Sequence, residues 1–170
     1  MESRVFAVVG TVFGAVFVAV NAGRLPALWT AIALAAGAVL LVIAIWRGVL
    51  SSVRTEETWT TSPRAYWLAV AAEVVAIPAG ATVLNRVVDE PDLVVLWVVL
   101  VVGAHFLPAR AFGVGRYAEL GVVLMSLAIV FAVVQLVGDV DWAAPAGAVL
   151  AGCALIAFAA VPALSRPRTR

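Results

Sequence analysis

The chain has 170 residues, of which 65% are hydrophobic and only 12% are charged, and its formal net charge is +1. An ordinary soluble domain has roughly 45–50% apolar and about 25% charged residues. The composition therefore excludes a soluble globular domain, a disordered tail and a nucleic-acid-binding protein.

Six long stretches carry almost no charged residue, and each is long enough to cross a membrane as a helix. They predict spans at about residues 5–23, 25–46, 65–86, 93–109, 117–138 and 142–164. A transmembrane helix needs about 20 mostly apolar residues. The stretches are apolar on all sides, which favours helices over barrel strands with alternating apolar and polar side chains. The first stretch is too long for the apolar core of a signal peptide, so we interpret it as an uncleaved helix.

The sequence thus predicts an all-α, polytopic membrane protein with one transmembrane domain covering residues 1–170. Its eleven basic residues are all arginines. Nine of them fall on one side of the predicted membrane, and the other two, Arg24 and Arg86, fall on the opposite side. Because short loops rich in basic residues stay in the cytoplasm, we expect a cell (inner) membrane protein with both termini and the loop 47–64 in the cytoplasm.

Short connections on the opposite side group the spans into three predicted hairpins, at 5–46, 65–107 and 117–164. Each hairpin begins with an arginine and a nearby aromatic residue, which leaves open whether the three are a true repeat. The first span also carries small residues at four-residue spacing, which permit close helix packing. These are Gly10, Gly14, Ala15 and Ala19. They indicate either packing within the bundle or docking of a partner subunit or a second copy.

Glu73 is the only acidic residue deep inside a predicted span. It lies nine residues after Arg64, roughly 13 Å into a hydrocarbon core about 30 Å thick. A charged residue near the bilayer centre costs about 2.5–3.5 kcal/mol, so it is a functional candidate by default. Pro78 follows five residues later and removes the helical partner of the Val74 carbonyl. This combination resembles the broken helices that line binding sites in transporters.

Other polar residues extend this candidate site. Thr11 and Ser126 reach a similar predicted depth, so together with Glu73 they predict a polar layer shared by three helices. His105 and Glu119 form a second group nearer the cytoplasm. His105 is suited to relaying protons, or the second group simply pairs to hold helix ends. The predicted binding residues are therefore Glu73, Ser126, Thr11, His105 and Glu119.

Several patterns of known chemistry are missing from the sequence. It has no His/Cys/Asp cluster with metal-ligand spacing, no nucleophile motif and no phosphate-binding glycine loop. Cys153 is the only cysteine, so it forms no internal disulfide. We therefore expect no cofactor and no metal, and we regard an enzyme as the less favoured class.

The stretch Gly103–Pro108, with the Ala/Val-rich and lysine-free composition, resembles small multi-helix membrane proteins of high-GC bacteria. The size, six spans and inward termini are also similar to those of substrate-binding subunits of vitamin uptake transporters. In that family an Ala-x-x-x-Ala element on the first helix meets the energising partner, and Ala15 and Ala19 match this element. The resemblance implies a partner subunit at the first helix.

Three functional hypotheses follow. The first is a non-enzymatic membrane protein that binds or transports a small molecule or a proton through a polar site around Glu73. The second is a structural or interaction protein whose buried polar groups pair with each other. The third is a membrane-embedded enzyme acting on lipid head groups, with His105 and Glu119 beside Arg110 and Arg116. We favour the first, and all three have the lipid bilayer as their surroundings.

Overall fold

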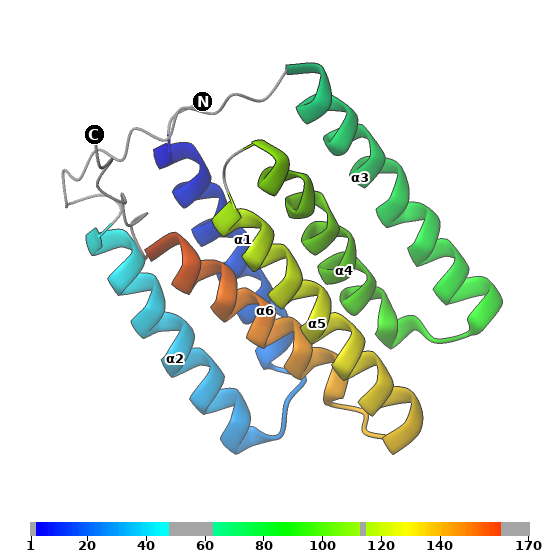
Figure 1. Cartoon of the computed structure of the whole chain (residues 1–170). Coiled ribbons are helices and arrows are strands. Elements are labelled where there is room, and N and C mark those ends of the chain that lie inside the picture. The colour runs from blue at the N-terminus through cyan, green and yellow to red at the C-terminus, as the bar shows by residue number, and fades with distance from the viewer. Residues whose placement is uncertain (1–2, 48–62, 113–114, 161–170) are drawn as a thin grey trace, which may run out of the picture.

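The computed structural model describes residues 3–47, 63–112 and 115–160 (Figure 1). The described residues form six α-helices, with short 3-10 and π segments at the ends of α3 and α4. The helices are α1 (Ser3–Ala22), α2 (Ala27–Ile45), α3 (Pro63–Val83), α4 (Val94–Phe106), α5 (Gly115–Gly138) and α6 (Ala143–Ala160). Most of the predicted loop 47–64 and the end of the last predicted span, after residue 160, lie outside the described residues.

Five helical stretches among the described residues are long and apolar enough to cross a membrane. They are Ala27–Ile45, Trp67–Val88, Pro91–Ala109, Arg116–Gly138 and Ala143–Ala160. In α1 the apolar stretch described in full is shorter, Val8–Ala22. The described part of the chain is therefore all-helical, and its long apolar helices are those of a membrane protein, as the composition predicts.

Local sequence signals explain where several helices begin and end. Pro26 precedes α2 with an extended backbone. Because proline has no amide hydrogen, it cannot donate the hydrogen bond that would continue the turn before it. Asp89 follows the π segment of α3, and Asp139 follows α5, both with positive φ angles of 58° and 50°. Aspartate tolerates the left-handed conformation that ends a helix better than most residues do. The short connections at these residues return the chain directly into the next helix.

The helix α6 lies at the centre of the bundle, between α1 and α2 on one side and α5 on the other (Figure 1). Eleven of its 18 residues are buried. The helices α1 and α6 run antiparallel, so α1 begins where α6 ends, and we call this the terminal end. The opposite end carries the connections at 23–26, 89–93 and 139–142, and we call it the connection end.

Glycines bring the backbones of α1 and α6 into direct contact. A methyl group at Gly14 would lie 2.6 Å from the Gly152 carbonyl oxygen, and a methyl group at Gly152 would lie 2.6 Å from the Gly14 oxygen. Gly103 of α4 and Gly121 of α5 face each other in the same reciprocal way. Small residues permit such close approach, which maximises van der Waals contact where lipid removes the hydrophobic driving force.

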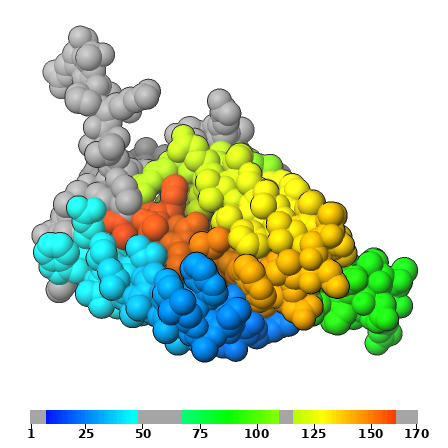
Figure 2. Space-filling view, turned by 90° about the horizontal axis from the view of Figure 1, so that it is seen from below, coloured from blue at the N-terminus to red at the C-terminus, as the bar shows by residue number. Residues whose placement is uncertain are grey.

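The helix α3 lies at the edge of the bundle. Among the described helices, α4 is the one on which it packs extensively. None of the residues in its span Trp67–Val88 is buried. In Figure 2, viewed toward the connection end, the green segment that joins α3 to α4 projects from the edge of the molecule, away from α1 and α2. The most extensive packing joins α1 to α6 and α4 to α5, contacts between helices that the predicted hairpins do not pair.

Candidate functional site

Glu73 and His105 meet across the contact between α3 and α4. The Nδ1 atom of His105 lies 3.2 Å from the Oε2 atom of Glu73, within ion-pairing distance. The two side chains are 19% and 25% exposed, for His105 and Glu73 respectively, and the Nδ1 atom itself is buried. The structure thus places the only deep acidic residue beside the only histidine of the chain.

The pairing joins two groups that the sequence separates by depth. Counted along their helices, Glu73 falls near the middle of its span and His105 falls near the end of its own. In Figure 1 the first turns of α3 extend past the terminal end of α4, which brings the middle of α3 level with the last turns of α4. Depth counted along one helix carries no information about how far the neighbouring helix is shifted.

The geometry defines a chemical role for each atom of the pair. The Nδ1 and Oε2 atoms attract each other only when one of them carries a proton, because otherwise two acceptor atoms face each other 3.2 Å apart. In other proteins a carboxylate beside an imidazole orients the ring of a general base. A carboxylate beside an imidazole is thus the type of pair that proton-exchanging sites use.

A row of rings continues from His105 toward α6 at the terminal end. His105 meets Phe106 edge-on with 5.6 Å between ring centroids, and Phe106 stacks on Tyr117 at 6.2 Å. Tyr117 packs on Phe158, whose ring also lies 4.3 Å from the Arg116 guanidinium carbon. Arg116 donates a hydrogen bond to the Phe158 carbonyl, 2.9 Å away. Arg116 thus binds a carbonyl of the last turn of α6, which has no partner within the helix.

The structure does not gather the other predicted binding residues around Glu73. Thr11 is half-buried on α1, which packs mainly on α6 and α2. Ser126 and Glu119 are both exposed, two turns apart on one face of α5. The carboxylate next to His105 is therefore that of Glu73, and the Arg110 side chain lies outside the described residues.

Trp97 makes a second polar contact between α3 and α4, which the sequence does not reveal. Its Nε1 donates a hydrogen bond to the Ala76 carbonyl oxygen, 2.9 Å away. A methyl group at Gly80 would overlap the indole ring, so the ring occupies the space that this glycine leaves open. Trp97 lies near the start of the predicted span 93–109, where a tryptophan is typical of the membrane interface. The signal that could have suggested the contact is Pro78-x-Gly80 on the preceding span, where the glycine leaves room for a large ring.

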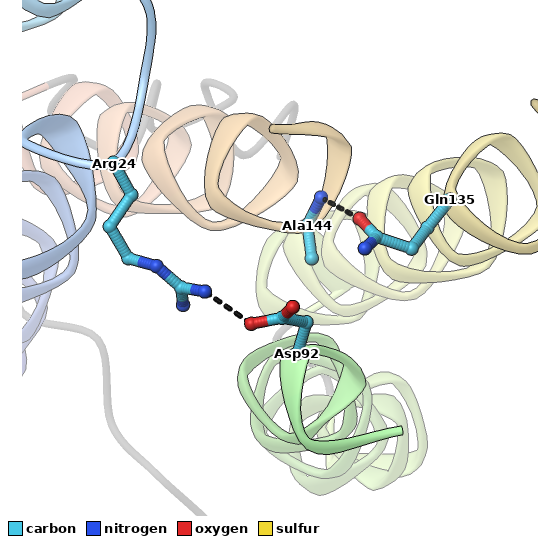
Figure 3. Close-up of polar contacts among 4 residues, drawn as sticks. All are labelled: Arg24, Asp92, Gln135 and Ala144. Carbon is cyan, nitrogen blue, oxygen red and sulfur yellow. Dashed lines mark hydrogen bonds and ion pairs between the residues drawn. The ribbon is translucent and has the colours of Figure 1, made fainter. Parts of the chain in front are cut away.

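Polar contacts at the connection end join parts of the chain that are distant in sequence (Figure 3). Arg24, between α1 and α2, forms an ion pair with Asp92, just before α4. Both side chains are nearly half exposed. The Gln135 side-chain oxygen accepts a hydrogen bond from the Ala144 amide, 2.9 Å away, and so caps the first turn of α6.

Among the described residues, no three His, Cys, Asp or Glu side chains gather closely enough to hold a metal ion. No protein family, no curated protein and no solved structure matches the chain. The function is therefore argued from the residues and their geometry.

Proposed function

We propose that the chain is a multi-pass protein of the cell membrane that takes up and releases a proton at Glu73 and His105, in the binding or transport of a proton or a small molecule. The proposal includes six spans in three hairpins and both termini in the cytoplasm, on the strength of the arginine distribution. His105 lies toward the end of α4 nearer the terminal end, so the proposed proton exchange is with the cytoplasm.

The single observation that carries the proposal is the distance of 3.2 Å between a carboxylate and an imidazole on two apolar helices. Ionisable residues inside spans are rare because they are costly, and they mark proton relays and substrate sites in transporters. Pro78 adds a loosened turn to the same helix. A carboxylate–imidazole pair between α4 and the peripheral helix α3 fits a site that changes its protonation state.

The experiment uses the fact that the chain has one histidine. The protein is labelled with ¹⁵N-histidine, purified with a histidine-free tag and placed in lipid nanodiscs, so that the spectrum contains one imidazole. We expect the imidazole signals to change with pH, because the proposal requires the ring to take up and release a proton. We also expect the Nδ1 signal to change in Glu73→Gln.

The control is Glu90→Gln, which makes the same chemical change at the connection end and is expected to leave the imidazole spectrum as in the wild type. A ring that keeps one protonation form at every pH at which the protein stays folded, or a spectrum unaffected by Glu73→Gln, would overturn the proposal. Vesicles containing the protein and a pH-sensitive dye, energised by a potassium diffusion potential, then show whether the proton crosses alone. Flux in the wild type that falls to the rate of protein-free vesicles in Glu73→Gln would indicate that it does.

The structural or interaction hypothesis remains the alternative, and one observation favours it. The Glu73–His105 pair and the Trp97–Ala76 hydrogen bond are two interhelical polar contacts that hold α3 to α4. If they serve only to hold α3, the imidazole does not exchange its proton while the pair is intact. Docking of a partner through the first helix also stays a prediction. Gly14 is buried against α6, whereas Ala19 is exposed.

The lipid-modifying enzyme hypothesis would place Glu119 with His105. Glu119→Gln separates this reading from the proposed one. It would alter the imidazole spectrum only if the Glu119 carboxylate, and not that of Glu73, orients the ring.

A further inference from the structure

We infer that Trp97 is a positioning residue: its indole, seated at Gly80 and bonded to the Ala76 carbonyl, sets how α3 lies on α4 and so holds Glu73 opposite His105. The functional meaning of this inference rests on the proposed function. The contact itself stands on distances that do not depend on it.

The two interhelical contacts lie on one face of α3 and in one register. From Glu73 to Gly80 is seven residues along α3, and from His105 back to Trp97 is eight residues along α4. At 1.5 Å per residue both separations are roughly 11–12 Å, as expected for two antiparallel helices in contact at both places. A shift of α3 by one residue turns its side chains by about 100°. Such a shift would turn Glu73 away from α4, and the Trp97 contact opposes it.

Trp97 also bridges the weakest point of α3. Pro78 lacks an amide hydrogen, so the Val74 carbonyl loses its helical partner and the helix can bend there. Ala76 precedes Pro78 and Gly80 follows it, and the indole touches both. One rigid ring therefore contacts both sides of the proline. Because Glu73 lies before Pro78, the angle at this point determines where its carboxylate points.

Within the described part of the chain, α3 packs extensively on one helix. Its span has no buried residue, and α4 is the only helix against which it packs extensively. The side chains of Thr82 and Asn85 bond to carbonyls of their own helix, those of Pro78 and Ala81. Loss of the Trp97 contact is therefore expected to change the site, because no other described helix packs extensively on α3.

The test compares two variants with two matched controls in the ¹⁵N-histidine experiment. Trp97→Phe keeps most of the ring but removes the indole N–H, and Gly80→Ala adds a methyl group where the indole lies. The controls are Trp29→Phe, at an exposed residue of α2, and Gly23→Ala, where an added methyl group meets no atom within 4 Å.

Loss of one hydrogen bond predicts a roughly two- to tenfold fall in the ratio of paired to unpaired His105 in Trp97→Phe. Gly80→Ala is expected to lose the paired signal, and both controls are expected to keep it. The conservative Trp97→Phe variant decides the question if Gly80→Ala fails to fold. A paired signal that is the same in Trp97→Phe and the wild type would overturn the inference.

The failures of the two proposals are distinguishable. If wild-type His105 exchanges no proton but Trp97→Phe still changes its Nδ1 signal, the positioning role holds and the proposed function fails. If the wild type exchanges a proton and Trp97→Phe leaves the signal unchanged, the proposed function holds and the positioning role fails.

Discussion

The helices α6 and α3 are both apolar and of similar length, 18 and 21 residues, but they occupy opposite positions in the bundle. Eleven residues of α6 are buried, and it packs against four other helices. No residue of the α3 span is buried, and its extensive packing is with α4 alone. Apolar character therefore does not decide which helix lies at the centre of a membrane protein.

The two helices are also held by different interactions. Contact between backbones dominates around α6, because Gly14 and Gly152 let α1 and α6 approach without side chains between them. Polar contacts hold α3, through Glu73 and His105 and through Trp97 and Ala76. A helix held by few contacts can respond to the protonation of one of them, whereas a helix packed on all sides cannot. The candidate site lies on the helix that is free to respond.

The largest expected effect breaks the central packing. Gly152→Val places a branched side chain where the Gly14 carbonyl and Phe17 already lie. Overpacking of this kind costs about 1–3 kcal/mol, and more where a backbone must move. We expect the free energy of unfolding to fall by about 3 kcal/mol, measured by detergent-driven unfolding with tryptophan fluorescence. Gly23→Val, in open space, is the control, and equal stability of the two variants would contradict the packing described here.

A smaller effect is expected at α3. In Glu73→Gln the carboxylate beside His105 is lost, and interhelical polar contacts in membranes contribute about 0.6 kcal/mol, up to about 1.7. We expect faster hydrogen exchange confined to α3, with α6 unchanged, in nanodiscs analysed by mass spectrometry. Glu90→Gln serves as the control here too. Faster exchange that extends into α6 would show that the two regions are not independent.

A still smaller effect is expected at the connection end. Arg24 and Asp92 are both substantially exposed, and exposed ion pairs contribute only about 0.2–1 kcal/mol. We expect Arg24→Ala to reduce the free energy of unfolding by this amount at low salt and by less at high salt, because salt screens exposed charges. A double-mutant cycle with Asp92→Asn isolates the pair, and a coupling energy that does not change with salt would argue against an ion pair.

The smallest effect is expected at Ser126. It is exposed on α5, whereas the Glu73–His105 contact lies between α3 and α4. Exposed substitutions usually change stability by less than about 0.5 kcal/mol, so Ser126→Ala is expected to unfold at the same detergent fraction as the wild type. A loss well beyond this value would restore the predicted polar layer that includes Ser126.

The residue patterns predicted the helices, but they did not predict which helices pack on one another. The spans are bounded by charges, prolines and aspartates that act locally, such as Pro26 and Asp89, so their limits follow from the chain itself. Glu73 stands out by charge alone. That His105 is its partner could not be predicted. A helix that is apolar on every side has no amphipathic pattern to show which of its faces meets which helix.

The sequence by itself determined that this chain is a helical membrane protein, where its helices run, and that Glu73 is the exceptional residue within them. Only the tertiary structure decided that α6 is central, that α3 is peripheral, that His105 is the partner of Glu73 and that Trp97 meets Gly80. The physical reason is that insertion into lipid depends on the composition of each segment taken separately. Packing between segments depends on small differences in shape and on single polar contacts that exist only once the helices meet.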